Sequence, residues 1–302
     1  MHNKPAITLA LGGGGVKCYA QIGVIQTLTE AGITIKGMAA TSGGAVIAGL
    51  YALGKSPAEI ISIIKQFDIQ RLSRHTRYDR AALFGLHHWR PALEAVFGRL
   101  TFADLAVPLA LPTVDVATRQ QVVINAGPLV DAILAAAAIP GIYPTQSSAG
   151  RELMDGGVLT PVPAALARSL APALPVVAVA LIPPYDDWGA HPFPQLINTV
   201  PWLRLLGRLR FTQALANYVS AADLTNRMLA ETLLQVDAPD FVIRPAVNHL
   251  GLFDKISIEE IVGLGEAASR AALPQILARW PGASTGFDCP NSAQRDNDHY
   301  SS

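Results

Sequence analysis

The sequence predicts an α/β fold in which a mostly parallel central sheet lies between layers of helices. Short apolar segments alternate with amphipathic helical segments along the first half of the chain, a pattern typical of parallel sheets. Half of the 302 residues are hydrophobic and 15% are charged, enough apolar residues for a large core. Pro175–Leu181 is a short continuous apolar run, as expected for a strand covered on both faces.

The elements of the first half are expected in a regular order. A strand is predicted at Ile7–Leu11 and a helix at Tyr19–Ala31, where apolar residues recur at helical spacing before Gly32. The next strand is predicted at Ile33–Ala39, and a helix is expected to start at Ser42.

Ser56 followed by Pro57 is typical of a helix N-cap, with the helix running through Lys65. The polar, basic segment Arg71–Arg90 is either a mobile flap or an ordinary surface crossover. Further predicted elements are strands at Val107–Ala117, Gln121–Asn125 and Pro175–Leu181, and a helix at Leu129–Ala138. No linker interrupts the chain, so residues 1–280 are expected to form one domain, followed by a disordered polar tail over residues 281–302.

Charge and cysteine content exclude several classes of partner. Lys and Arg number 23, as do Asp and Glu, and this neutral balance argues against a nucleic-acid partner. The two cysteines, Cys18 and Cys289, form neither a disulfide framework nor a metal site, and we expect no metal. No apolar run reaches the ~18–20 residues of a membrane-spanning helix, and no signal-peptide pattern is seen, so a cytoplasmic protein is expected.

A loop of four glycines, Gly12–Gly15, lies between the first predicted strand and helix. Consecutive backbone N–H groups at a helix start can hold an anion, either a phosphate or the oxyanion of a tetrahedral intermediate. Lys17 stands where a dinucleotide loop needs glycine, and it is preceded by valine and followed by cysteine, unlike a Walker A lysine. A purely structural tight turn is the alternative.

Ser42 and Asp155 are the strongest candidates for catalysis. Ser42 lies in Ala40-Thr41-Ser42-Gly43-Gly44, at a strand-to-helix junction where small neighbours suit a nucleophile elbow. Asp155 is followed by Gly156 and Gly157. The structural alternatives are a helix N-cap for the serine and an ordinary Asp-Gly turn for the aspartate.

Four motifs in this order resemble the bacterial patatin-like phospholipase family, and the resemblance extends from about Ile7 to Leu277. The motifs are Leu9–Lys17 (glycine-rich loop and basic residue), Ala40–Gly44 (the Gly-x-Ser-x-Gly elbow), Ala137–Pro144 (the Ala-Ile-Pro-Gly-Phe-Pro stretch) and Asp155–Gly157 (the Asp-Gly-Gly box). The chain departs from the pattern at Ala40 and Cys18, where the family has glycines. We expect alanine to be tolerated if its φ stays negative, and Cys18 to be buried as a packing residue.

The resemblance implies a three-layer fold and a Ser42–Asp155 dyad without a cofactor. The oxyanion would be held by backbone N–H groups of Gly13, Gly14 and Gly15. Gly43 is a further candidate donor, and Lys17 would either meet a lipid phosphate or brace the loop against a carboxylate. Burial beneath an apolar site would raise the pKa of Asp155 and help it to accept a proton.

Other residues with catalytic chemistry receive lesser roles. His249 could complete a conventional triad in chain order, but a surface or packing role is favoured. His87-His88 is interpreted as loop, and Asp115 as a structural residue on a strand. The basic amphipathic segment Trp202–Phe211 is either an ordinary packed helix or a peripheral membrane contact.

The expected function is hydrolysis of a phospholipid, lysophospholipid or related acyl ester. The alternative is a patatin-fold protein that binds a lipid or a partner without turnover. A nucleotide-binding enzyme is a third hypothesis, which the failed nucleotide motifs make weak.

Overall fold

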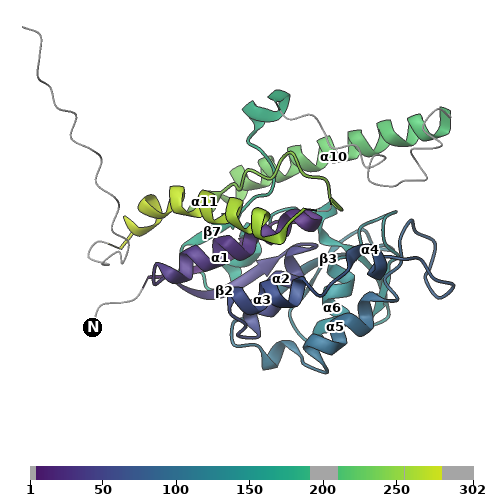
Figure 1. The fold of residues 1–302 in the computed structure, drawn as a ribbon, viewed down its shortest axis with the longest axis horizontal. Helices are drawn as coiled ribbons and strands as arrows, with labels where there is room; N and C mark the ends of the chain where they lie inside the picture. Colours follow the sequence, from purple (N-terminus) through teal and green to yellow (C-terminus); the bar gives the residue numbers. More distant parts are fainter. Residues whose placement is uncertain (1–4, 191–209, 255, 281–302) are drawn as a thin grey trace, which may run out of the picture.

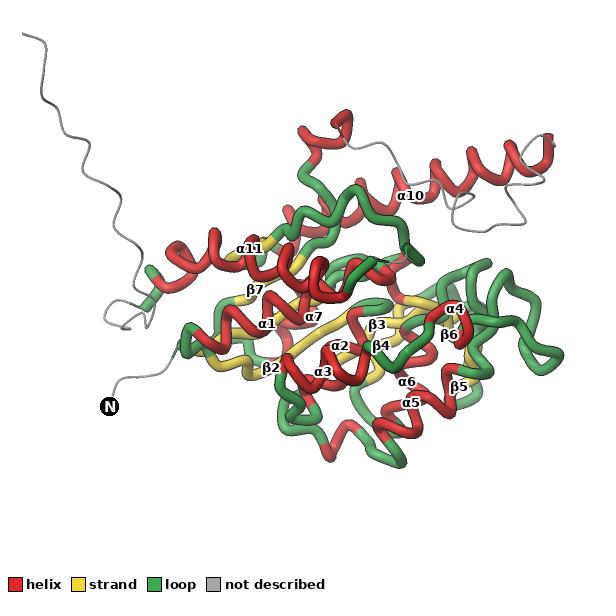
Figure 2. Tube along the Cα trace, viewed as in Figure 1, coloured by secondary structure: helices red, strands yellow, loops and turns green. Residues whose placement is uncertain are grey.

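A mixed sheet forms the centre of the structure (Figures 1 and 2). This computed structural model describes residues 5–190, 210–254 and 256–280. Within them the sheet has eight strands in the order β5-β6-β3-β2-β1-β7-β8, with β4 also paired to β3. The strands are β1 (Ala6–Leu11), β2 (Thr34–Ala40), β3 (Leu109–Asp115), β4 (Gln121–Ile124), β5 (Gln146–Ser148), β6 (Arg151–Asp155), β7 (Val176–Val179) and β8 (Phe241–Ile243).

The sheet is parallel from β3 through β2, β1 and β7 to β8, as predicted, and becomes antiparallel where β3 pairs with β4 and β6. The helices are α1 (Ala20–Glu30), α2 (Gly44–Ala52), α3 (Pro57–Ile64), α4 (Ile69–Leu72), α5 (Trp89–Phe97), α6 (Leu129–Ala136), α7 (Ala164–Leu170), α10 (Arg210–Asp237) and α11 (Ile258–Leu277). Short 3-10 turns are η1 (Gly15–Tyr19), η2 (Phe102–Asp104), η3 (Gly156–Val158) and η4 (Tyr185–Ala190).

The side chains of β1 explain how the two helical layers pack. Ile7, Leu9 and Leu11 point into the larger core, which includes α1, α2, α6 and α11. Ala10 faces the opposite side, where alanines of β7 and α7 and two residues of α10 form a smaller core. Because successive residues of a strand face opposite sides, one strand supplies bulky residues to one layer and small residues to the other.

The predicted elements of the first half are confirmed with small shifts at their ends. The helix at Ser56-Pro57 has the expected cap: Ser56 Oγ accepts from the N–H of Glu59, and the Glu59 carboxylate accepts from the N–H of Ser56. The helix predicted to reach Ala138 ends at Ala136, because Ala137 leaves the helical conformation before Pro140. Trp202–Phe211 lies almost wholly outside the described residues, and so does the tail over residues 281–302.

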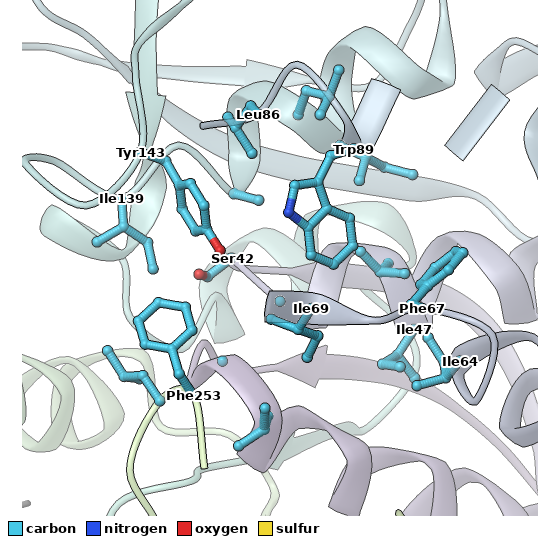
Figure 3. Close-up of a pocket in the computed structure, with 18 of the residues that line it drawn as sticks. Ser42, Ile47, Ile64, Phe67, Ile69, Leu86, Trp89, Ile139, Tyr143 and Phe253 are labelled. Atoms are coloured by element: carbon cyan, nitrogen blue, oxygen red, sulfur yellow. The ribbon is translucent and has the colours of Figure 1, made fainter. Parts of the chain in front are cut away.

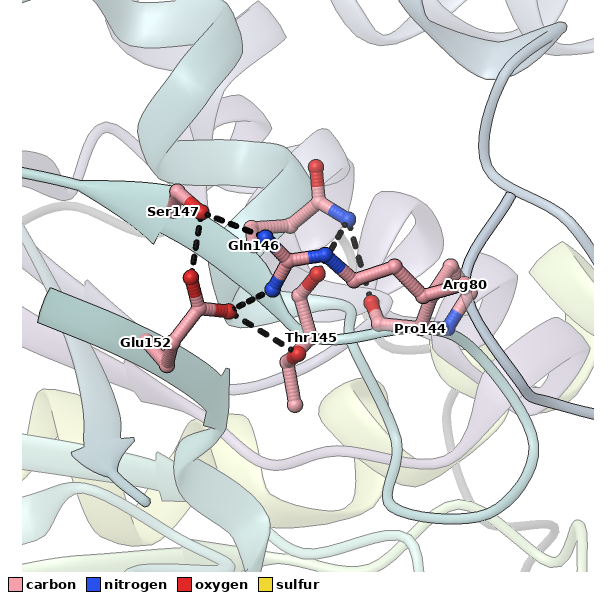
Figure 4. A network of polar contacts seen from close by, with 6 residues as sticks. All are labelled: Arg80, Pro144, Thr145, Gln146, Ser147 and Glu152. Atoms are coloured by element: carbon pink, nitrogen blue, oxygen red, sulfur yellow. Dashed lines mark hydrogen bonds and ion pairs between the residues drawn. The ribbon is translucent and has the colours of Figure 1, made fainter. Parts of the chain in front are cut away.

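The segment between α4 and α5 has the contacts of an ordered crossover. The Asp79 carboxylate accepts from the backbone N–H groups of Thr76, Leu86 and His87, at 2.8, 2.8 and 3.0 Å. Arg80 reaches across to Glu152 on β6 and Ser147 on β5 (Figure 4). Backbone bonds from Leu83 and Phe84 to residues 141 and 142 complete the attachment.

Helices α1 and α11 are in close contact at Gly265. A methyl group on this glycine would overlap the carbonyl oxygen of Ala20. We expect Gly265→Ala to lower the free energy of unfolding by about 1–3 kcal/mol, because the two helices must separate. Gly263 is the matched control in the same helix, since a methyl group there meets nothing within 4 Å. Gly263→Ala should raise stability by roughly 0.5–1 kcal/mol through helix propensity. Urea unfolding followed by circular dichroism tests both, and equal effects would contradict the close crossing.

Candidate active site

Ser42 occupies a sharp turn between β2 and α2. Its φ is +56°, a left-handed conformation that is strained for a residue with a side chain. The turn is closed by backbone bonds from Gly44 to Thr41 and from Ala45 to Ser42, at 3.0 and 2.9 Å. The N-cap residue of α2 is Gly43, without a side-chain cap, so Ser42 does not play the N-cap role weighed in the sequence. The geometry is that of a nucleophile elbow.

Small residues surround the elbow because the chains approach closely there. A methyl group at Gly13 would stand 3.0 Å from Cβ of Ser42, and one at Gly44 would stand 3.3 Å from the carbonyl oxygen of Gly12. Ala40 is fully buried and is absent from the residues with positive φ. The strained conformation therefore falls on Ser42, and alanine in place of the family's glycine is compatible with the turn.

The glycine loop presents free backbone donors beside Ser42. The N–H groups of Gly15 and Gly43 have no hydrogen-bond partner within the described part of the chain, whereas the N–H of Gly14 lies within hydrogen-bond range of the Cys18 sulfur. Gly15 has a φ of +58°, and a methyl group on it would overlap the carbonyl oxygen of Leu252. Ser42, Gly15 and Gly43 line one pocket. These donors can stabilise negative charge that develops on an atom bonded to Ser42.

The N–H of Gly13 is also engaged, in a hydrogen bond between backbone groups. It donates to the carbonyl oxygen of Pro161 at 3.0 Å, just as Gly12 donates to Val179 at 2.9 Å. In this structure the Gly13 N–H is thus already engaged, and the sequence expectation for this residue needs correction. Gly13 contributes the space beside Ser42 instead, and Gly43 takes its place among the available donors.

Asp155 lies at the end of β6, is only 3% exposed, and has its carboxylate within hydrogen-bond range of the Ser42 hydroxyl. The N–H of Gly157 donates to its Oδ1 at 2.7 Å. Gly156 must lack a side chain, because a methyl group there would overlap the Pro112 carbonyl oxygen. Burial raises the pKa of Asp155 to about 6, although the hydrogen bonds from Ser42 and Gly157 oppose the shift. This pKa makes the carboxylate a better proton acceptor than an ordinary aspartate.

An apolar pocket extends from Ser42 between the helices (Figure 3). Tyr143, Ile139 and Phe253 surround its Ser42 end, whereas Phe67, Ile47 and Ile64 lie at the other end. Its lining is almost entirely apolar, drawn from α2, α3, α5, α6 and the loop at Leu252–Phe253. A pocket of this composition is suited to a hydrocarbon chain attached to the atom that Ser42 attacks.

Cys18 and Lys17 follow the glycine loop and are both buried. The Cys18 thiol donates a weak hydrogen bond to the Gly12 carbonyl at 3.7 Å, and burial raises its pKa, so it remains a neutral packing group as expected. Burial, followed by repulsion from Arg227, lowers the pKa of Lys17. Among the described residues no carboxylate lies within ion-pair distance of Lys17, although Asp223 and Asp254 attract it from further away.

The other sequence candidates lie apart from this pocket. His249 is absent from its lining, and the titratable group within hydrogen-bond range of Ser42 is Asp155. His87 and His88 line a separate polar pocket beside Arg80. Asp115 Oδ1 accepts from the N–H of Ala117 at 2.9 Å, which is the structural part expected of it. In the described ranges no cluster of three or more His, Cys, Asp or Glu residues could hold a metal ion.

Comparison with known proteins identifies the family of this chain. The chain superposes on the crystal structure of VipD from Legionella pneumophila with a TM-score of 0.54 at 13% identity, over 92% of this chain and 67% of that one. This likeness concerns the fold alone. Residues 9–168, more than half of the chain, match the family model described as patatin-like phospholipase. The chain belongs to the patatin-like phospholipase family.

Curated proteins with similar sequences support this family assignment. An uncharacterized NTE family protein of Mycobacterium tuberculosis is 33% identical over 74% of this chain and 61% of its own length. Patatin-like phospholipase domain-containing protein 7 of Rattus norvegicus is 26% identical over 96% of this chain and 23% of its own length. The chain therefore spans only part of these relatives.

No helix in the described ranges combines the length and apolarity needed to cross a membrane.

Proposed function

We propose that this protein is a serine acyl-ester hydrolase that uses Ser42 and Asp155 as a dyad. The observation that carries the proposal is the pairing of a strained, buried serine with a buried aspartate within hydrogen-bond range of it, whose pKa is raised to about 6. The free N–H groups of Gly15 and Gly43 support it, and so does the apolar pocket that begins at the same serine.

In the first half of the reaction, Ser42 Oγ attacks the acyl carbonyl and its proton passes to Asp155. The carbonyl oxygen becomes an oxyanion, which the N–H groups of Gly15 and Gly43 stabilise. Each such donor typically lowers the barrier by roughly 3–4 kcal/mol. The bond to the alcohol then breaks, and the alcohol leaves with the proton that Asp155 holds.

In the second half, water attacks the acyl-enzyme and gives its proton to Asp155. The second tetrahedral intermediate collapses, the carboxylic acid leaves, and Ser42 recovers its proton. Over the two halves, one water is consumed and the alcohol and the carboxylic acid are released. The atoms therefore balance without a metal or cofactor. The raised pKa of Asp155 suits both directions of proton transfer near neutral pH.

The substrate is proposed to be a lipid acyl ester, of the kind that a phospholipase A or a lysophospholipase hydrolyses. The apolar lining from Ile139 to Phe67 favours a hydrocarbon chain over a polar acid. Family membership points in the same direction. Whether Lys17 also meets a lipid phosphate depends on the head group, which the acyl pocket does not select.

A fluorophosphonate with an alkyl chain tests the nucleophile directly. Ser42 Oγ would form a bond to phosphorus while fluoride leaves, and the adduct mass should be found on the peptide that contains Ser42. Labelling should abolish hydrolysis of p-nitrophenyl esters in proportion to the labelled fraction. A lipid-binding protein without turnover would neither hydrolyse the esters nor react, and modification of a different serine would refute the assignment of Ser42.

A further inference from the structure

A chain of polar side chains interrupts the apolar wall of the pocket beside Ser42. Trp89 Nε1 donates to Ser73 Oγ at 3.2 Å, and Ser73 Oγ lies 2.7 Å from the hydroxyl of Tyr143. Trp89 and Tyr143 both line the pocket, and in Figure 3 the Tyr143 hydroxyl points toward Ser42. The proposed hydrolysis makes no use of this network.

A count of hydrogens shows that the network has one proton too many. Trp89, Ser73 and Tyr143 carry one polar hydrogen each, and the two contacts use two of them. If Tyr143 donated to Ser73, the spare hydrogen would remain on Ser73, which is 4% exposed and does not line the pocket. A buried donor without an acceptor costs about 1–3 kcal/mol. The favoured arrangement therefore has Ser73 donating to Tyr143, with the Tyr143 proton directed into the pocket.

Two further facts concern the Tyr143 hydroxyl. Trp89 also lies within hydrogen-bond range of the Tyr143 oxygen, so both other members of the network lie beside it. Burial raises the pKa of Tyr143 to about 12, so the phenol keeps its proton at physiological pH. Tyr19 lines the same pocket, and its hydroxyl has no hydrogen-bond partner among the described residues.

The position of the network selects which part of a substrate it can meet. Trp89 packs edge-on against Phe67, with ring centres 5.8 Å apart, and Phe67 lies at the end of the pocket away from Ser42. Trp89 thus reaches toward that end, whereas the Tyr143 hydroxyl lies at the Ser42 end, beside the first atoms of an acyl chain. The carbonyl oxygen itself is directed to the backbone N–H groups of the glycine loop. A second oxygen atom of the substrate is therefore needed to accept the hydrogen bond from the Tyr143 hydroxyl.

We propose that Tyr143 donates to an oxygen atom on the acyl chain near the scissile carbonyl, and that Tyr19 assists it. This inference rests on the proposed hydrolase function and names its substrate class: esters of oxygenated acyl chains, which carry an ether, hydroxyl or oxo group close to the carboxyl end. A site built to hydrogen-bond a substrate oxygen discriminates against the analogue that lacks it, because the buried donor is then left unpaired.

The test uses pairs of p-nitrophenyl esters of equal chain length, one unsubstituted and one with an ether oxygen in place of a methylene. The oxygen is moved along successive carbons, and kcat/KM is measured for the wild type and Tyr143→Phe. At one position the preference for the ether over the methylene should be about tenfold greater in the wild type, the value of one hydrogen bond of ordinary strength. Comparing the two proteins on the same pair cancels the intrinsic reactivity of each ester.

Tyr51→Phe is the matched control, since Tyr51 is a partly buried tyrosine outside the pocket. It should leave every pair unchanged, and Tyr19→Phe should reduce the same preference as Tyr143→Phe. Equal changes for both members of each pair would overturn the inference.

Binding separates this inference from the proposed function. The affinity for each ester pair is measured by calorimetry, without turnover, for Ser42→Ala and for the double variant Ser42→Ala/Tyr143→Phe. The two ether preferences are then compared. A tenfold loss of ether preference would support the role of Tyr143 even if the wild type hydrolysed none of the esters, a result that would refute only the hydrolase. Unchanged affinities would refute the role of Tyr143 alone.

Discussion

Replacing Ser42 by alanine should abolish ester hydrolysis, lowering kcat by a factor of at least about 10⁴. The size of the effect follows from the chemistry, because removing a nucleophilic serine from a dyad or triad leaves only binding and the oxyanion donors. Release of p-nitrophenol from a medium-chain ester measures it, with single-turnover experiments to separate chemistry from product release. Activity within tenfold of the wild type would mean that the nucleophile is another residue.

Stability measurements make the same variant more informative. Alanine at position 42 would keep the φ of +56°, whereas glycine adopts this conformation without strain. Ser42→Gly should therefore be as inactive as Ser42→Ala, and its free energy of unfolding should be higher by about 1 kcal/mol. Identical stability of the two variants would contradict the strained elbow. Loss of activity in a variant that is at least as stable as the wild type excludes unfolding as the cause.

The sequence predicted the parallel part of the sheet because its strands are short apolar runs between recognisable helix signals. β1, β2 and β7 have this character, and their residues are mostly buried, with Lys36 of β2 the exposed exception. The antiparallel strands β5 and β6 were missed. They span three and five residues and carry exposed or half-exposed polar side chains such as Arg151 and Glu152. Their strand conformation comes from the pairing of β6 with β3 and of β5 with β6, and not from a local pattern.

The candidate site divides in the same way. The elbow at Ser42 and the turn at Gly156 were predictable, because small residues in a short motif reflect backbone that has no room for side chains. The bond from Gly13 to Pro161 was not, since it joins residues far apart in the sequence and depends on how the loop after η3 packs. The network of Ser73, Trp89 and Tyr143 is similar: only Tyr143 lies in a motif, and nothing local indicates its partners.

Asp155→Asn is expected to remove activity while raising stability above about pH 6. The carboxylate is the proton acceptor, and an amide cannot replace it, so kcat should fall by a factor of at least about 10⁴. In the wild type, kcat/KM should rise with pH through an apparent pKa near 6, because only the ionised form of Asp155 accepts the proton of Ser42. An activity profile that is flat between about pH 5 and pH 7 would contradict this assignment.

The stability of the wild type should change in the opposite direction over the same range. An ordinary aspartate, as in the unfolded chain, has a pKa of 3.8, whereas the pKa of Asp155 in the folded protein is about 6. The unfolded chain therefore loses this proton first as pH rises. Folding stability therefore falls between about pH 4 and pH 6, by about 3 kcal/mol for a shift of about two pKa units. Asparagine stays neutral and does not have this penalty. Asp155→Asn should thus match the wild type near pH 4 and exceed it at pH 8 in urea unfolding, and a variant less stable than the wild type at pH 8 would show that Asp155 stabilises the fold as an anion.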